Sequence, residues 1–216
     1  MNYPNAAKGL HRIVISEIIA LISSIIAVVV SVLAFSDEEA LPEDGYTFGV
    51  ISIVMLVIIG LYIAAYVLQI FGIILASKDE PAFKVSLYAI ITAIILTVLS
   101  GVFYENETVA FVISIAQDVA QFFLVHYIIH GIMHLSHHLD RPEIAKRGTY
   151  IFRVIYIAII FEVIVRFIEI IYGKEGAETI GMPFDIVANI LKTIEYILFL
   201  IYIIKGSKML KEKQPE

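Results

Sequence analysis

The chain has 216 residues, of which 60% are hydrophobic and 17% charged, with a mean hydropathy of +0.90 and a formal net charge of −6. This composition excludes an ordinary soluble domain, because so few polar residues could not cover an apolar core of that size. The absence of cysteine excludes disulfides, iron–sulfur clusters and thiol nucleophiles.

Six apolar runs are long enough to cross a membrane. A helix needs about 20 residues to span a hydrocarbon layer of roughly 30 Å. The runs are continuously apolar rather than alternating, which argues against the strands of a transmembrane barrel. We predict one all-α domain over residues 1–216, a polytopic integral membrane protein whose six transmembrane helices cover about 13–35, 48–76, 83–103, 109–135, 150–172 and 184–204.

Charged residues flank these runs asymmetrically. Bases mark one set of ends, at Lys8, Arg12, Lys78, Lys84, Arg141, Lys146, Arg147, Lys205, Lys208, Lys211 and Lys213. Acids mark the other set, at Asp37, Glu38, Glu39, Glu43, Asp44, Glu105, Glu107, Glu175 and Glu178. Because cytoplasmic loops are enriched in Lys and Arg, we predict a multi-pass protein of the cell membrane with both termini cytoplasmic. The lipid bilayer is the expected partner and nucleic acid is not, since topology already explains the bases.

Three segments begin alike, each just before an odd-numbered run: PNAAKGLHRI from Pro4, PAFKVSLYAI from Pro81 and PEIAKRGTYI from Pro142. Proline suits the first position of a helix, because it lacks an N–H that would be unsatisfied there. The spacing predicts three helical hairpins of one orientation. Such a repeat differs from the inverted repeats of many secondary transporters.

The fourth run ends in HYIIHGIMHLSHH, residues 126–138, which holds five of the six histidines. At about 100° per residue, His126, His130, His134 and His137 share one helical face, and His138 turns away. Neutral imidazole is a common metal ligand, so a transition metal such as zinc or iron is the cofactor that this face would bind. The helix rises about 16 Å from residue 126 to residue 137, so only an adjacent pair could share one ion. The helpers near the same half of the bundle are Glu17, His11 and Asp140.

The same segment resembles the histidine boxes of the membrane fatty-acid desaturase and hydroxylase superfamily. HYIIH and HGIMH are similar to its HxxxH box, and HLSHH is similar to its HxxHH box. In that superfamily the resemblance implies a di-iron centre held by several boxes on different helices. Here the resemblance covers residues 126–138 alone and places all the boxes on one helix, so the di-iron activity is not carried over.

Polar side chains gather in the last three runs. They are Gln117, Asp118 and Gln121 in the fourth, Glu162, Arg166 and Glu169 in the fifth, and Asp185, Asn189, Lys192 and Glu195 in the sixth. In the fifth and sixth runs, a spacing of three or four residues places each set on one helical face. At about 1.5 Å per residue, Asp118 and Lys192 lie roughly 13 Å below the outer surface, with Arg166 about 9 Å and Glu162 about 15 Å deep. We expect these four side chains to meet in one layer.

A charge at mid-bilayer costs on the order of 3 kcal/mol, so these faces must turn toward one another or toward water. In one arrangement, Glu162 pairs with Arg166 and Lys192 pairs with Asp118 or Glu195, and the pairs hold the bundle together. In the other, the acids line an outward-facing cavity that attracts cations, since the acids outnumber the bases in these runs.

We therefore expect a membrane permease or ion channel for a cation or small solute, proton-coupled, with an outward-facing polar cavity in helices 4–6 and a histidine-lined cytoplasmic half of helix 4. Two alternatives stay open. One is a membrane-embedded metal-dependent enzyme acting on a lipid or hydrophobic substrate, and the other is a non-catalytic component or pore-forming effector that assembles as a homo-oligomer. For the histidines, two alternatives to a metal site also stay open: a path for protons, and a polar helix end at the membrane interface.

Overall fold

The computed structural model describes residues 3–35, 45–176 and 181–212. Part of the predicted charge asymmetry lies outside these ranges, at Asp37, Glu38, Glu39, Glu43, Asp44, Glu178 and Lys213. The orientation of the chain in the membrane therefore stays a prediction.

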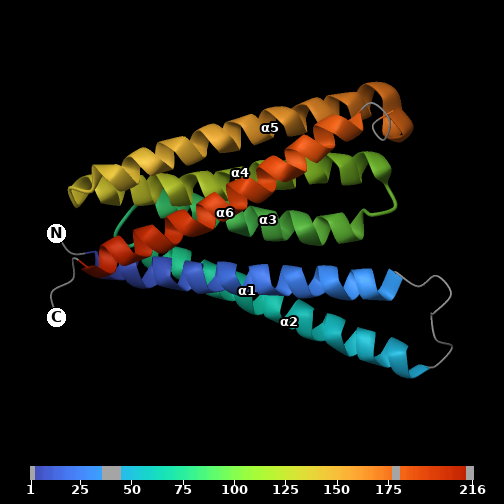
Figure 1. Ribbon diagram of the computed structural model, residues 1–216, viewed down its shortest axis with the longest axis horizontal. Helices are drawn as coiled ribbons and strands as arrows, with labels where there is room; N and C mark the ends of the chain where they lie inside the picture. Colours follow the sequence, from blue (N-terminus) through green and yellow to red (C-terminus); the bar gives the residue numbers. More distant parts are fainter. Residues whose placement is uncertain (1–2, 36–44, 177–180, 213–216) are drawn as a thin grey trace.

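The described residues form helices joined by short connections, which confirms the all-α prediction (Figure 1). The helices are α1 (Pro4–Phe35), α2 (Gly45–Ala76), α3 (Ala82–Val102), α4 (Glu107–His138), α5 (Pro142–Gly176) and α6 (Met182–Glu212). Five of them, α1, α2, α3, α4 and α6, are long and apolar enough to cross a membrane. Helix α5, which carries Arg153, Glu162, Arg166 and Glu169, is not among the five, and its crossing of the membrane stays a prediction.

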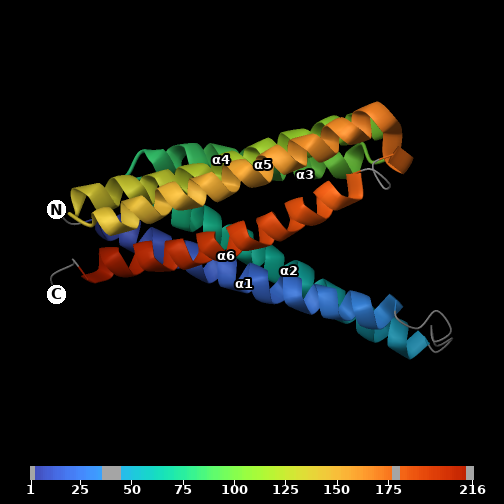
Figure 2. The same ribbon diagram turned by 45° about the horizontal axis from the view of Figure 1, so that its top comes forward.

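The predicted hairpins are confirmed, because the most extensive contacts join α1 to α2, α3 to α4 and α5 to α6. Helix α1 begins and α6 ends at the same end of the bundle, here called the terminal end, and the opposite end is the distal end (Figure 1). Figure 2 shows α1 and α2 diverging from α3, α4 and α5 toward the distal end, with α6 between the two groups. Helix α6 contacts α1, α4 and α5, so it connects the two groups.

Helices α1, α4, α5 and α6 extend beyond the predicted apolar runs at the terminal end. Helices α1 and α5 both begin at a proline, Pro4 and Pro142. The first turn of α1 is capped from the connection between α2 and α3, since the Asp79 carboxylate accepts hydrogen bonds from the backbone N–H of Ala6 and the side-chain amide of Asn5, both at 2.8 Å. The turn between α2 and α3 is thereby tied to the start of α1.

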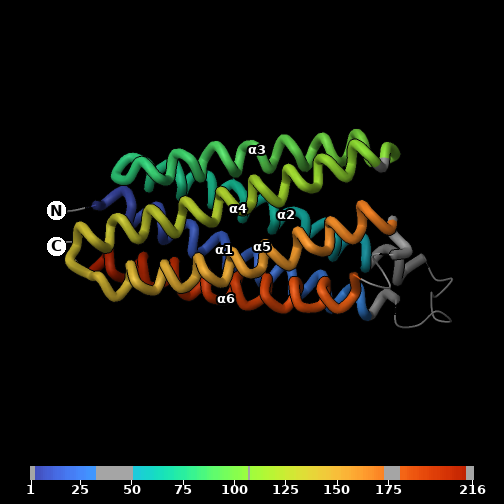
Figure 3. Tube along the Cα trace, turned by 90° about the horizontal axis from the view of Figure 1, so that it is seen from above, coloured from blue at the N-terminus to red at the C-terminus, as the bar shows by residue number. Residues whose placement is uncertain are grey.

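The buried core lies mainly in the terminal half of the bundle. Its fully buried side chains include Leu10, Ile73, Phe83, Ile132 and Leu135, drawn from four of the helices. Toward the distal end, many large apolar side chains are exposed, for example Val28 at 62% and Leu56 at 68%. Exposed apolar surface of this extent is the lipid-facing surface of a membrane protein. Figure 3, at a right angle to Figure 1, again shows α3 and α4 side by side along the length of the bundle.

Helices α1 and α2 cross at two glycines. A Cβ atom on Gly9 would clash with the carbonyl oxygen of Gly72 and would lie 2.7 Å from the backbone nitrogen of Ala76. A Cβ atom on Gly72 would lie 2.8 Å from the carbonyl oxygen of Gly9. Since backbone cannot move aside as a flexible side chain can, only glycine permits this approach.

We expect Gly9→Ala and Gly72→Ala each to lower stability by about 1–3 kcal/mol, because the added methyl group overpacks a backbone contact. The matched control is Gly60→Ala on α2, where a Cβ atom would meet no heavy atom within 4 Å. In the control, alanine should be neutral or stabilising, since it favours a helix over glycine by about 1 kcal/mol. Thermal unfolding of the detergent-purified variants measures the difference. Equal unfolding temperatures for Gly9→Ala and Gly60→Ala would contradict the tight crossing.

Candidate functional site

Ion pairs join α4, α5 and α6 in the distal half of the bundle. The Arg166 guanidinium lies 3.2 Å from the Asp118 carboxylate of α4 and 3.4 Å from Glu169 of its own helix. The Lys192 ammonium of α6 pairs with the Glu162 carboxylate of α5. Two pairings expected from the sequence are therefore wrong: Glu162 pairs across to α6 instead of with Arg166, and Lys192 pairs with neither Asp118 nor Glu195. Pairs between helices depend on how each helix is rotated, which spacing along one helix does not reveal.

A pocket of about 260 Å³ lies between α4, α5 and α6, and we call it the α4–α6 pocket. Its polar lining consists of Asp118, Gln121, Glu162, Lys192, Glu195 and Tyr196. Apolar side chains, Phe122 and Phe199 among them, complete the wall. The structure thus brings together residues from all three polar stripes that the sequence indicated.

A second pocket, of about 190 Å³, lies against α1 and α2, and we call it the α1–α2 pocket. Its polar lining consists of Ser16, Glu17, Ser24, Tyr62, Tyr66, Gln69, Gln121 and Tyr196. Gln121 and Tyr196 line both pockets, so the two cavities adjoin across these side chains. We refer to them together as the joined pockets.

Glu17 is the most buried acid of the joined pockets, at 9% exposure. The side-chain amide of Gln69 donates a hydrogen bond to its carboxylate at 2.8 Å. The Tyr196 hydroxyl donates to the backbone carbonyl of Glu17 at 3.1 Å, which links α6 to α1. The sequence offered Glu17 as a helper for a histidine metal site, but its carboxylate lines a pocket to which none of the histidines contributes.

Two carboxylates of the joined pockets form no ion pair among the described residues. Asp118 and Glu162 are paired with Arg166 and Lys192. Glu17, in the α1–α2 pocket, and Glu195, in the α4–α6 pocket, form no such pair in the described part of the chain, although the charge of Lys192 also acts on Glu195. A carboxylate without an ion-pair partner is costly to bury as an anion, which makes these two groups the candidates for binding a proton or a cation.

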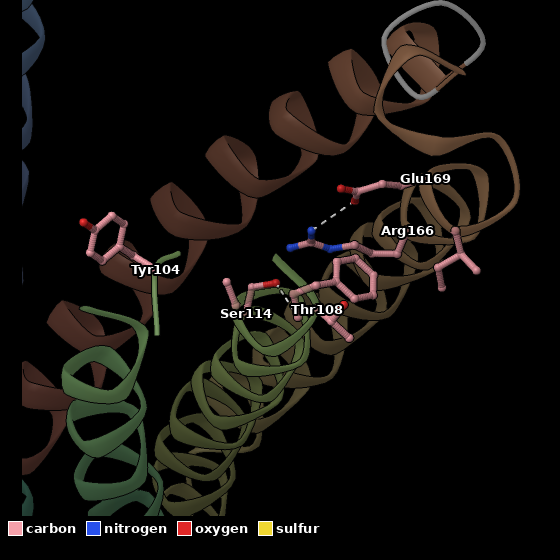
Figure 4. Close-up of a pocket in the computed structure, with 8 residues that line it drawn as sticks. Tyr104, Thr108, Ser114, Arg166 and Glu169 are labelled. Carbon is pink, nitrogen blue, oxygen red and sulfur yellow. Dashed lines mark hydrogen bonds and ion pairs between the residues drawn. The ribbon is translucent and has the colours of Figure 1, made fainter. Parts of the chain in front are cut away.

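A third pocket, of about 530 Å³, lies closer to the distal end, between the start of α4 and the second half of α5 (Figure 4). It is lined by Tyr104, Thr108, Phe111, Ser114, Arg166 and Glu169. The Arg166 guanidinium also lies 5.7 Å from the centre of the Phe111 ring, a distance at which a cation and an aromatic face attract. Arg166 therefore separates this distal pocket from Asp118 and the α4–α6 pocket.

Two residues predicted for the cavity lie elsewhere. The Gln117 side chain donates a hydrogen bond to the Thr97 hydroxyl of α3 at 3.1 Å, so it faces the other helix of its own hairpin. Asn189 is exposed and is not among the residues that line the three pockets described above. Both belong to the predicted stripes, but the rotation of α4 and α6 turns them away from the others.

The histidines of α4 do not act as one face. His126 stacks on Phe152 of α5, with ring centres 4.4 Å apart, and its Nδ1 atom is buried without a hydrogen-bond partner among the described residues. His130 is exposed one turn further along, and its ring is roughly parallel to that of His126 at 6.5 Å. His137 is exposed.

His134 turns toward a different neighbour. Its Nδ1 atom lies 2.5 Å from the buried Glu80 carboxylate in the turn between α2 and α3. The rings of His134 and His138 are 4.3 Å apart, and the Tyr3 hydroxyl lies 3.0 Å from His138 Nδ1. His138, which the helical projection turned away from the others, thus joins His134 in a contact between α4, the α2–α3 turn and the start of α1.

Within the described ranges, no three His, Asp or Glu side chains are grouped so that they could hold a metal ion. The proposed helpers His11 and Asp140 are both exposed, and neither hydrogen-bonds a histidine in the described structure. A transition metal on this helix therefore stays a sequence prediction, without a ligand set in the fold to support it.

Sequence reasoning missed the half of the site contributed by α1, α2 and Tyr196. Gln69 is the one side-chain amide in α2, and Ser16, Ser24 and Tyr62 also carry polar groups within long apolar helices. An uncharged polar residue inside an apolar run is a weaker signal than a charge, because its cost in lipid is lower. Gln69 was the residue from which the sequence could have indicated a polar site on α2. In the structure its side-chain amide donates a hydrogen bond to the Glu17 carboxylate.

Comparison of this chain with protein-family models, with curated proteins and with solved structures finds no match. A function is therefore inferred from the positions and chemistry of the described side chains.

The cross-helix pair of Lys192 and Glu162 gives a direct test of this geometry. We expect Lys192→Met to destabilise the protein by about 1–2 kcal/mol, less than a fully buried pair would, because both side chains are partly exposed to the pocket. The double variant Glu162→Met/Lys192→Met should recover much of this loss, since no unpaired charge remains. Thermal unfolding of the wild type, both single variants and the double variant completes the cycle. Strictly additive losses would show that the two residues do not interact.

Proposed function

We propose that this protein is a membrane permease that moves a small cation, a proton or an alkali ion, by way of the joined pockets. The observation that carries the proposal is the pair of carboxylates, Glu17 and Glu195, that line adjoining pockets within the bundle and form no ion pair among the described residues. Structural ion pairs alone would leave every acid matched, as Asp118 and Glu162 are. The excess acids thus favour a cation-binding role.

The surrounding groups suit a cation better than an anion. Around Glu17, the donor and acceptor groups are the Gln69 amide, the Tyr196 hydroxyl and the paired hydroxyls of Ser24 and Tyr62, 2.7 Å apart. Hydroxyl, amide and carboxylate oxygens are the ligands that hard cations prefer. The two bases of the site are already engaged by Asp118, Glu162 and Glu169, which leaves little attraction for an anion.

The packing favours a carrier over an open channel. Between the joined pockets and the terminal end, Ile13, Leu124, Ile128 and Ile203 are fully or almost fully buried and belong to one apolar cluster. A hydrated ion cannot pass such a cluster without a rearrangement of the helices. Transport would therefore require the terminal half to open while the distal half closes, as in alternating access.

His126 supports a proton as the transported or coupled ion. Its ring packs against Phe122, which lines the α4–α6 pocket, at a centre distance of 5.3 Å, and it lies one turn nearer the terminal end. Imidazole can both accept and donate a proton near neutral pH. The unpartnered Nδ1 atom is available for such a step, so we place His126 next along the route after the joined pockets.

We expect Glu17→Gln and Glu195→Gln each to reduce cation flux at least tenfold, because glutamine keeps the size and hydrogen bonding of the side chain but cannot bind a proton or balance a cation. Flux is measured in proteoliposomes with internal dyes sensitive to pH, to sodium and to potassium, under imposed gradients of each ion. The matched control is Glu105→Gln, an exposed acid outside the joined pockets whose carboxylate accepts a hydrogen bond from Tyr104.

The control should transport as the wild type does, and all three variants should elute as folded protein before reconstitution. Wild-type proteoliposomes that dissipate none of the three gradients would contradict a cation permease. So would unchanged flux in both Glu17→Gln and Glu195→Gln.

A further inference from the structure

A separate pocket, of about 230 Å³, lies at the terminal end between the start of α5 and the end of α6. Its lining consists of Arg141, Glu143, Ile144, Arg147, Lys205, Lys208, Met209 and Glu212. None of these residues lines the joined pockets, so this cavity is independent of the proposed transport route. We call it the basic pocket.

The charge of the basic pocket is unbalanced. Arg141 engages both acids, with Glu143 at 3.7 Å and Glu212 at 3.5 Å. The remaining bases, Arg147, Lys205 and Lys208, form no ion pair with any residue that the structure describes. Three cations from two helices thus converge on one cavity and keep their hydrogen-bond donors free for an anion. Arginine and lysine are the side chains that proteins use to hold phosphate groups.

The position of the basic pocket indicates which anion it meets. It lies where α5 begins and α6 ends, and both helices continue from it into their apolar segments. Its lining also contains Ile144 and the buried side chain of Met209, so the cavity combines charged and apolar side chains. Such a lining, where two helices continue into apolar segments, matches a molecule with a phosphate head and an apolar body.

We propose that the basic pocket binds the phosphate group of an anionic phospholipid, with Arg147, Lys205 and Lys208 as its ligands. The shared chemistry is a phosphate group, which a soluble phosphate also carries. The apolar lining residues Ile144 and Met209 favour the lipid as the source. Basic residues whose only role is to set the membrane topology need not gather around a cavity. Lys78, Lys84 and Lys146 are examples, because they are exposed at the same end of the bundle and do not line the basic pocket.

The test uses the full chain reconstituted in phosphatidylcholine vesicles that contain trace spin-labelled phosphatidic acid or spin-labelled phosphatidylcholine. Electron paramagnetic resonance measures the fraction of labelled lipid held at the protein surface. We expect phosphatidic acid to be held several-fold more strongly than phosphatidylcholine in the wild type. Arg147→Gln/Lys205→Gln/Lys208→Gln should abolish this preference, whereas Lys78→Gln/Lys84→Gln/Lys146→Gln, with the same change of charge at the same end, should keep it.

Equal loss of preference in the two triple variants would overturn the proposal, because it would assign the effect to diffuse surface charge. Absence of any preference in the wild type would overturn it as well. A parallel measurement follows the thermal stability of the detergent-solubilised proteins in inorganic phosphate and in chloride of equal ionic strength. Stabilisation by phosphate that depends on the basic pocket, without a lipid preference, would reassign the ligand to a soluble phosphate and overturn the lipid.

Discussion

The structure depends on one constraint, that a charge among apolar helices needs a partner. Arg166 meets it by contacting Asp118 across to α4, and Lys192 meets it by pairing with Glu162 between α6 and α5. These contacts hold the distal halves of three helices around a polar interior instead of an apolar one. Because two bases cannot balance all the acids of this region, the same contacts leave Glu17 and Glu195 without ion-pair partners among the described residues, and the candidate site follows from that excess.

The two ends of the bundle are packed by different means. Toward the terminal end, Gly9 and Gly72 let α1 and α2 approach backbone to backbone, and fully buried isoleucines and leucines fill the space between helices. Toward the distal end, α1 and α2 diverge from α3, α4 and α5 (Figure 2), and polar pockets replace the apolar core. The bundle is thus tightly packed at the terminal end and lined with polar pockets toward the distal end. Helix α6 contacts both groups of helices, so under the proposed carrier function we would expect a change in its tilt to accompany transport.

The histidine segment shows which features a local sequence pattern can predict and which it cannot. A helical projection places His126 and His134 on the same face of one helix, but it contains no information about the neighbouring helices. In the fold, α5 covers His126 with Phe152, while the α2–α3 turn presents Glu80 to His134. Residues two turns apart on α4 therefore serve different contacts. A metal site needs ligands that converge from several elements, and convergence is a property of tertiary structure.

The sequence by itself determined those features that depend on whether each segment of the chain lies in an apolar or a polar environment. Hydropathy predicted the apolar helices, proline and charge predicted their ends and their pairing into hairpins, and the density of charges in the last three runs predicted where the polar site lies. Tertiary structure alone decided the partners. It paired Lys192 with Glu162, turned Gln117 toward α3, brought Gln69 to Glu17 and gathered Arg147, Lys205 and Lys208 around one cavity. The physical reason is that hydropathy is a sum over neighbours in sequence, whereas an ion pair or a pocket depends on the rotation and crossing of helices that the sequence specifies only through their combined packing.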